Sequence, residues 1–387
     1  MFLLIFTMAC VEIGARFYMG QVLQKSAESK FRFNYYRVYE HVPGFTEGDG
    51  QGDRMTIERN GFRRVDDVAV EKAEGTFRIF LLGGSAAHGI SSAPPYPIAH
   101  VNDDETIDAH LEVLLKEHLP GRKVEVINAA VTGYQVFQHT QYLLSELLEF
   151  DPDLVIFFDG ANDHYSTNPE HRYLSDFRYQ FWKTRLQEPS FGTVLDAFAF
   201  WMSKYSGAFR GYVAWKLNRD AQMNSKRIDL TRPYDTDQER IEAHKQLSGA
   251  QYLRSMETNL FLLQREGVKA IICLQPMLVL RDVDLLSDVE SAFLNKDPNA
   301  PVLYPTVLQE LEQVSRTWDV PFVDMNPAFN ERAYDGEQLF IDYCHLNSKG
   351  GQVCAEHLLP VVVELIQGPP MIEADSARIT APEGSGI

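Results

Sequence analysis

The sequence predicts an α/β fold in which helices cover both faces of a parallel β-sheet. Short apolar runs alternate with longer stretches of helical periodicity, and a glycine or a polar residue follows each of the first three runs. Sheets of this kind bind ligands beyond the carboxyl ends of their strands. The residues that come after these runs are Ser85, Gly133 and Asn162, so we expect them to share one edge of the sheet.

The first half of the alternation supplies three strands and two helices. Residues 77–82 form a short apolar run that ends at two glycines, as a buried parallel strand does. Residues 108–118 carry a helical period, 124–128 form a second strand, 135–149 form a strongly amphipathic helix, and 153–159 form a third strand.

The regular pattern breaks after the third strand and returns near residue 246. The remaining elements are then expected as helix 246–265, strand 269–274, helix 305–318, strand 321–323 and helix 350–366.

The rest of the chain falls into flanking and inserted segments. We expect residues 76–368 to form one domain, with a helical insertion at 164–245 and a flexible tail at 369–387. Residues 25–75 form an N-terminal extension, which we expect to be irregular because it is rich in charged residues and glycine.

The insertion is rich in aromatic and basic residues. It begins directly after Asn162, which favours a cap over the mouth of a site. An added helical layer with aromatic core residues, or a docking surface for a membrane or a protein partner, would explain the composition too. The aromatic residues are Tyr173, Phe177, Tyr179, Phe181, Trp182, Phe198, Phe200, Trp201, Tyr205, Phe209, Tyr212 and Trp215.

Composition and charge exclude some classes of function. The chain has 387 residues, of which 45% are hydrophobic, so a sizeable core can be buried. Its net charge of -18 and the lack of a Lys/Arg run argue against a nucleic-acid partner. The cysteines have no zinc-site spacing, and the spacing of Cys344 and Cys354 leaves a disulfide between them undetermined.

The N-terminus opens with an apolar run that ends before Glu12. The run is shorter than the roughly 20 residues of a membrane-spanning helix, and it lacks the basic start of an ordinary signal peptide. We expect residues 1–24 to be a hydrophobic helix that anchors or exports the chain to a bacterial cell envelope. A helix that packs on the domain is the plainer alternative.

Four short motifs carry candidate chemistry, although each has an ordinary structural explanation. Two glycines before Ser85 can expose a serine on a tight turn between a strand and a helix. Asp342 lies three residues before His345, a spacing that lets the carboxylate hold the imidazole Nδ1–H. Asn162 can aim an amide donor at an oxyanion, and Gly133, read as opening a helix, can offer a backbone N–H.

The structural explanations are turns and caps. A Gly-Gly-Ser turn is more often structural than catalytic, and Asn and Asp commonly form turns after a strand. Cys344 is an alternative nucleophile because it adjoins His345, but consecutive side chains point in different directions, which argues against it.

In their order along the chain, the four motifs resemble the blocks of the SGNH hydrolase superfamily, also called GDSL-type esterases. The resemblance covers residues 77–366 and includes the order of the strands. Glycine replaces the usual aspartate of the first block, which weakens assignment to a typical lipase subgroup. The matching residues are Gly83-Gly84-Ser85, Gly133, Gly160-Ala161-Asn162-Asp163 and Asp342-Tyr343-Cys344-His345.

The resemblance implies a flavodoxin-like three-layer α/β/α sandwich and a serine hydrolase without metal or cofactor. Ser85 would be the nucleophile, His345 the general base and acid, and Asp342 the residue that orients it. The N–H groups of Ser85 and Gly133 and the side-chain amide of Asn162 would form the oxyanion hole.

Two functions fit this resemblance. The first is a serine esterase or acyltransferase that acts on a small acyl group, such as an O-acetyl group on a cell-envelope carbohydrate. The second is a non-catalytic subunit of a membrane-associated assembly that retains the fold. The segment Asn60-Gly61-Phe62-Arg63 is similar to the lead-in of membrane-anchored bacterial SGNH proteins, and a surface loop is its plain explanation.

Overall fold

The structure is a computed structural model, and part of the chain lies outside its described residues. The predicted tail, most of the N-terminal segment and most of the insertion fall outside the described residues. The described residues are 12–14, 30–34, 36–48, 54–90, 100–165, 198–199, 202–203, 205–213, 215–216, 236–294 and 299–368.

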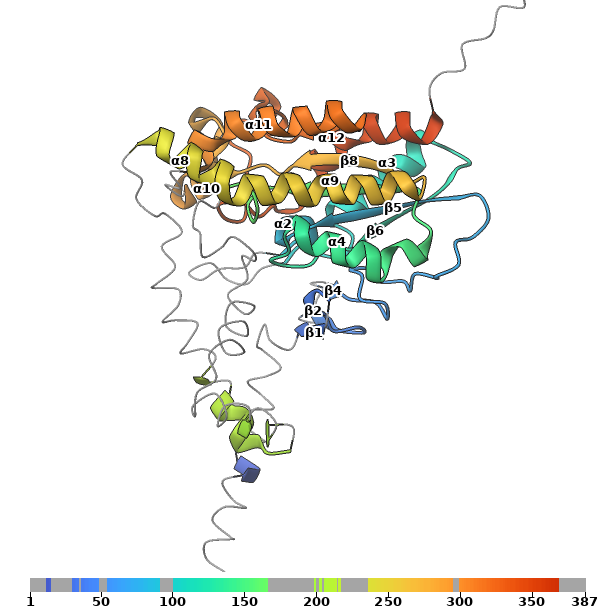
Figure 1. Cartoon of the computed structure of the whole chain (residues 1–387), viewed down its shortest axis with the longest axis vertical. Coiled ribbons are helices and arrows are strands. Elements are labelled where there is room, and N and C mark those ends of the chain that lie inside the picture. The colour runs from blue at the N-terminus through green and yellow to red at the C-terminus, as the bar shows by residue number, and fades with distance from the viewer. Residues whose placement is uncertain are drawn as a thin grey trace, which may run out of the picture.

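A five-stranded parallel sheet forms the centre of the fold (Figure 1). The strands lie in the order β6-β5-β7-β8-β9, and each pair is parallel. Numbered along the chain within this sheet, the order is 2-1-3-4-5, which is the flavodoxin-like arrangement. All five expected strands are present within a residue of their expected bounds. They are β5 (Thr76–Gly83), β6 (Lys123–Asn128), β7 (Leu154–Asp159), β8 (Lys269–Leu274) and β9 (Phe322–Asp324).

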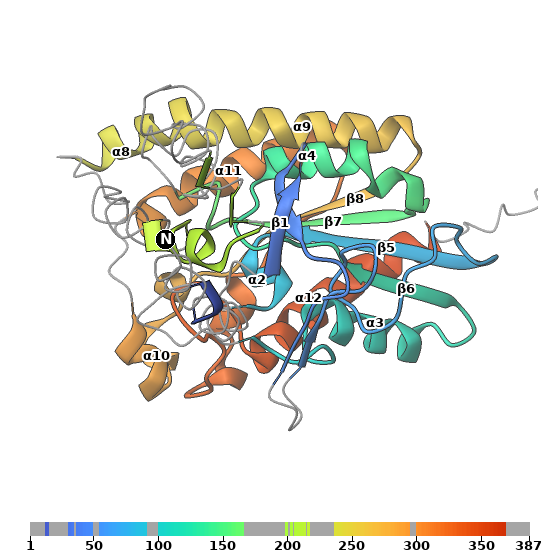
Figure 2. The same ribbon diagram turned by 90° about the horizontal axis from the view of Figure 1, so that it is seen from below.

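Helices cover both faces of the sheet, as the apolar runs predicted. Alternate residues of a strand point to opposite faces. In β5, Phe80 and Leu82 therefore join one core while Ile79 and Leu81 join the other. Figure 2 shows α4 (Val136–Ser145), α9 (Ala250–Arg265) and α11 (Asn299–Trp318) on one side, and α3 (Ile107–His118) and α12 (Ser348–Gln367) on the other.

Three helices differ from their expected bounds by four residues or more. The helix expected over residues 246–265 starts as a π-helical turn, Lys245–Gly249, and becomes α-helical at Ala250. The helix expected over residues 135–149 leaves helical geometry at Glu146 and continues as a 3-10 turn, Leu147–Phe150, which still buries Leu147 and Phe150. Helix α11 begins at Asn299, so Pro305 lies inside it. An interior proline costs a helix about 3 kcal/mol or more. Burial of Ala300 and Leu303 in the first turns offsets that cost.

The N-terminal extension is more regular than expected. It contains the antiparallel hairpins β1 (Phe31–Asn34) with β2 (Val38–His41) and β3 (Thr46–Gly48) with β4 (Arg54–Thr56). The strands are only three or four residues long, too short for a local pattern to identify them. The β1–β2 hairpin is instead held by tertiary contacts, since His41 stacks on His88 with ring centroids 4.4 Å apart.

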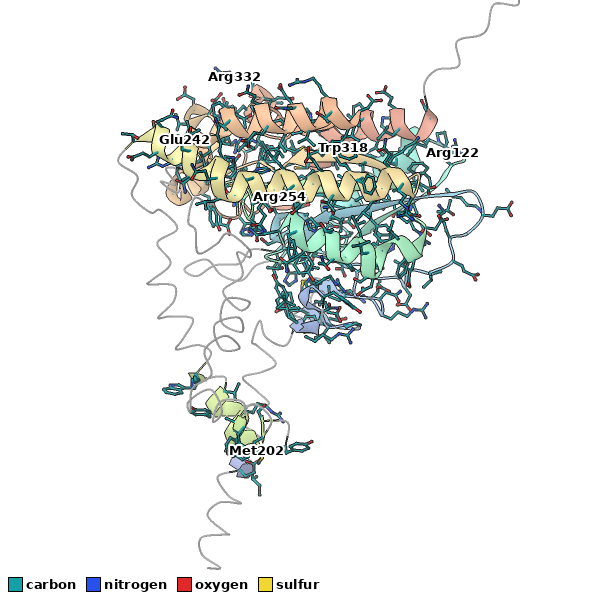
Figure 3. All side chains as sticks on the ribbon, viewed as in Figure 1. Arg122, Met202, Glu242, Arg254, Trp318 and Arg332 are labelled. Carbon is teal, nitrogen blue, oxygen red and sulfur yellow. The ribbon has the colours of Figure 1, made fainter. Side chains whose placement is uncertain are left out.

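The described stretches of the insertion are largely helical and carry exposed aromatic residues. Met202, labelled in Figure 3, lies in this region, apart from the α/β body. An aromatic core layer does not account for four of the aromatic residues, because they are 43–61% exposed. These are Phe198, Tyr205, Tyr212 and Trp215. None of the helices within the described ranges has the length and apolar character of a membrane span.

A buried ion pair anchors the loop that leads to Asp342. The side chains of Arg281 and Glu290 are fully buried and contact each other. Glu290 also accepts the backbone N–H groups of Leu339 and Phe340 at 2.9 and 3.0 Å. Arg281 donates to carbonyl groups of the same loop, so both charges are solvated by the protein backbone.

We expect Glu290→Ala to destabilise the protein by about 3–5 kcal/mol, because it leaves the Arg281 guanidinium buried without its counter-charge. Urea denaturation followed by circular dichroism measures the change. The control is Glu312→Ala, which removes an exposed ion pair with Arg316 and should change stability by less than about 0.5 kcal/mol. Equal effects of the two variants would contradict the role given to the buried pair.

Candidate active site

Ser85 lies at the carboxyl end of β5, where the chain turns into the short helix α2 (Ser85–His88). The two glycines before it are required by space. A Cβ atom on Gly83 would come within 2.5 Å of the Phe158 carbonyl oxygen, and one on Gly84 within 2.4 Å of Asn162 Nδ2. Ser85 is the first residue of α2, so its N–H has no acceptor within that helix.

The far end of α2 is held by Arg63, a residue whose role the sequence did not reveal. Its side chain is buried, and Nη1 donates to the carbonyl groups of Gly89, at 2.9 Å, and His88. These carbonyls lie at the carboxyl-terminal end of α2, where a guanidinium also meets the negative end of the helix dipole. Arg63 belongs to the Asn60–Arg63 segment, which is therefore a brace behind the nucleophile and no surface loop.

Asp342 and His345 lie in a tight loop before α12. An antiparallel bridge between Phe340 and Leu346 closes the loop, and Ile341 N–H donates to the His345 carbonyl at 2.8 Å. Asp342 Oδ1 accepts the backbone N–H of Cys344 and of His345 at 3.0 and 2.9 Å. The carboxylate is thereby fixed at the geometry in which it meets the imidazole.

The imidazole of His345 joins the other two side chains. Its Nδ1 lies 2.7 Å from Asp342 Oδ2, and its Nε2 lies 2.6 Å from Ser85 Oγ. The exposed fractions of Ser85, Asp342 and His345 are 9%, 0% and 1%. The structure thus brings together the serine, histidine and aspartate that the sequence motifs singled out, within hydrogen-bond reach of one another.

The electrostatics of the pair favour a positive charge on the imidazole. Burial alone would raise the pKa of Asp342, but hydrogen bonds from the His345 ring and from backbone N–H groups outweigh burial and lower it. Burial alone would lower the pKa of His345, but the Cys344 sulfur and the Asp342 carboxylate outweigh it and raise that pKa. A proton taken from Ser85 is therefore stabilised on His345.

Asn162 and Gly133 reach the site from the ends of β7 and β6. Asn162 Nδ2 donates to the Tyr134 carbonyl at 2.9 Å, and Gln135 Nε2 donates to the Asn162 carbonyl at 2.7 Å. Gly133 has φ +80°, which glycine adopts without strain. It lies in the turn before α4, which begins at Val136, so the expectation that Gly133 opens the helix was wrong.

Cys344 lies closer to the imidazole than its sequence position suggested. Its sulfur is 3.6 Å from His345 Nδ1 and 3.9 Å from Nε2, so the argument from side-chain direction was wrong. Ser85 Oγ nevertheless lies at hydrogen-bond distance from Nε2, the ring nitrogen that takes the proton of the nucleophile. Cys344 and Cys354 are free thiols, and no disulfide joins them.

Metal-ligating groups also meet at this site. Among the described residues, the one group with three such side chains close together is Asp342, Cys344 and His345, whose ligand atoms lie within 4.8 Å of one another. Asp342 and His345 are already hydrogen-bonded to each other, and His345 to Ser85. These bonds equip the group for proton transfer to and from the serine.

Comparison with known proteins finds likeness only among solved structures. No protein-family model matches the chain, and no curated protein matches it. A GDSL-like lipase from Parabacteroides merdae is similar over 74% of this chain and 95% of its own, with 12% identity and a TM-score of 0.43. An acylhydrolase from Bacteroides fragilis is similar over 76% and 89%, with 11% identity and a TM-score of 0.38.

A third similar structure is a catalytic mutant of an acetylxylan esterase from Geobacillus stearothermophilus. It covers 73% of this chain and 93% of its own, with 13% identity and a TM-score of 0.41. Because these TM-scores lie below 0.5, the function argued below depends on the geometry of Ser85, His345 and Asp342 and not on these likenesses.

Proposed function

We propose that this chain is a serine ester hydrolase of the SGNH type, with Ser85 as its nucleophile. The observation that carries the proposal is the position of His345, which bonds Ser85 Oγ through Nε2 and Asp342 through Nδ1. An imidazole held in this tautomer can accept the serine proton and return it to the leaving group. That is the arrangement nucleophilic acyl transfer requires.

In the first half of the proposed reaction, Ser85 Oγ attacks the ester carbonyl while its proton moves to His345 Nε2. The tetrahedral oxyanion is stabilised by the N–H groups of Ser85 and Gly133 and by the amide of Asn162. The leaving alcohol takes the proton from His345, which leaves an acyl-enzyme on Ser85. Water, activated by the now neutral His345, then attacks the acyl group and releases the acid and free Ser85.

We further propose that the acyl group is small, such as an acetyl group on a carbohydrate. The near-complete burial of Ser85 and His345 supports a small group at the reacting centre. Transfer to a sugar hydroxyl in place of water uses the same three residues, since only the acceptor differs. Release of acetate from p-nitrophenyl acetate, with and without an added sugar acceptor, distinguishes the two reactions.

The direct test of the proposal is labelling of Ser85. We expect a fluorophosphonate probe to label the folded protein, and Ser85→Ala to lose both labelling and hydrolysis of p-nitrophenyl acetate. Cys344→Ala should retain labelling, because the thiol is not the nucleophile. Labelling that persists in Ser85→Ala, or a folded wild-type protein that the probe does not label, would refute the proposal.

Asn162→Ala should lower kcat by roughly 10²–10³-fold with little change in KM. The amide is proposed to meet charge that develops only in the transition state, so substrate binding is largely unaffected. Steady-state kinetics with p-nitrophenyl acetate measure both constants. A rise in KM at unchanged kcat would show that Asn162 binds the ground state instead.

The rate should rise with pH as His345 loses its proton, with a midpoint above the ordinary 6.5 because the environment raises its pKa. Asp342→Asn removes the carboxylate that favours the imidazolium. The pKa of His345 should therefore fall, and the rise of the rate with pH should occur at lower pH.

The plateau rate of Asp342→Asn should also drop by about 10⁴-fold, because the imidazole loses its tautomer control. An NMR titration of the His345 ring protons measures the pKa independently of activity. The control is Asp335→Asn, which changes an exposed carboxylate of the preceding loop and should leave both the pKa and the rate unchanged. A pKa of His345 that does not fall in Asp342→Asn would contradict the proposed coupling.

A further inference from the structure

The N-terminal extension contacts the turn that carries Gly133 through Tyr39 of β2. Tyr39 Oη donates to the Thr132 carbonyl at 2.8 Å. In the opposite direction, the hydroxyl of Tyr134 donates to the Tyr39 carbonyl. The two rings also pack edge to face, with centroids 5.3 Å apart. Tyr39 therefore holds the residues on both sides of Gly133.

The bond to Thr132 controls the direction of the Gly133 N–H. The carbonyl of residue 132 and the N–H of residue 133 belong to one planar peptide group, in which they point in opposite directions. A donor that fixes the carbonyl on one side therefore fixes the N–H on the other. Glycine has no side chain to resist rotation of this peptide, and Gly133 already occupies the left-handed region at φ +80°.

The hairpin that supplies Tyr39 is anchored away from the turn. The Arg37 guanidinium lies 3.7 Å from the centroid of the Tyr142 ring and pairs with Glu40 and Glu146. The Arg37 carbonyl accepts Gln138 Nε2 at 3.0 Å. Since Tyr142 and Gln138 belong to α4, the hairpin is tied to the sheet domain independently of Tyr39.

We propose that Tyr39 is a positioning residue for the oxyanion hole. Its hydroxyl holds the Thr132–Gly133 peptide in the orientation that presents the Gly133 N–H to the oxyanion. The carbonyl of Tyr134 receives the Asn162 amide, so the same short turn orients two of the three donors. This inference rests on the proposed hydrolase function and adds a role for the N-terminal extension in catalysis.

The test is Tyr39→Phe, which removes the hydroxyl and keeps the ring. We expect kcat on p-nitrophenyl acetate to fall by roughly 10–100-fold, less than the loss of a whole donor, with KM unchanged. Inhibition by a boronic acid, which forms a tetrahedral anion on Ser85, should weaken by the same factor. The ¹⁵N–¹H resonance of Gly133 should shift, because the N–H changes its orientation.

Two tyrosines provide matched controls. Tyr36→Phe changes an exposed hydroxyl, 68% exposed, in the same hairpin and should have no effect. Tyr142→Phe removes a buried hydroxyl between the hairpin and α4 and should lower stability without lowering kcat. If Tyr39→Phe does not fold, Tyr134→Phe removes the reciprocal hydrogen bond and should lower kcat in the same direction.

The outcomes separate this inference from the proposed function. If the fluorophosphonate probe labels Ser85 but folded Tyr39→Phe keeps the wild-type kcat and boronate affinity, the positioning role is refuted while the hydrolase stands. A kcat loss in Tyr142→Phe equal to that in Tyr39→Phe would also refute it, since general loosening of the hairpin would then explain both. If Ser85 is not labelled at all, the proposed function has failed first.

Discussion

The hydrogen bond between His345 Nε2 and Ser85 Oγ is the interaction on which the site depends, and it requires two distant loops to be placed within a few tenths of an ångström. Ser85 begins the short helix α2, whose far end is held by Arg63. Gly83 and Gly84 let the chain before Ser85 pass close to Phe158 and Asn162. His345 is held by Asp342, whose carboxylate is itself fixed by two backbone N–H groups. The imidazole is thus bonded on both sides, to Asp342 through Nδ1 and to Ser85 through Nε2.

The order of the strands explains why these loops meet. In a 2-1-3-4-5 sheet the order of the strands reverses between the first and third strands, here β5 and β7. Sheets of this kind bind ligands beyond the carboxyl ends of the strands at that point. Ser85 and Asn162 follow these two strands directly. The Asn162 amide lies so close to Gly84 that a Cβ atom at this position would displace it. The contact between Asn162 and Gly84 thus fixes both the space before Ser85 and the position of the Asn162 amide.

Elements outside the sheet also hold the loops of the site in place. Arg63 and Tyr39 both come from the N-terminal extension. Arg63 donates to the carbonyl groups that end α2, the helix that begins at Ser85, and Tyr39 donates to the carbonyl of Thr132, next to Gly133. The buried Glu290 carboxylate accepts hydrogen bonds from the backbone N–H groups of Leu339 and Phe340, which lead into the Asp342 loop. Buried charges and hydroxyls that are hydrogen-bonded to backbone groups in this way rigidify the loops they hold.

The sequence by itself determined the layered α/β architecture, because apolar runs of strand length and amphipathic stretches of helical length are local properties of the chain. It also singled out Ser85, Asn162, Asp342 and His345, since their positions relative to glycines and to the ends of predicted strands can be read directly along the sequence. The end of α4 before Glu146 and the start of α11 at Asn299 were missed. In both places burial of neighbouring apolar side chains in the core outweighs the local helix preference of the sequence.

Only the tertiary structure decided the roles of Tyr39, Arg63 and Glu290. Tyr39 and Thr132 are 93 positions apart, and Arg63 and Gly89 are 26 apart, so no local pattern links them. The hairpin β1–β2 was missed for the same reason, since its short strands are stabilised by contacts with α2 and α4. Such contacts gain their free energy only when the partner surfaces are already formed, and a sequence pattern does not contain that information.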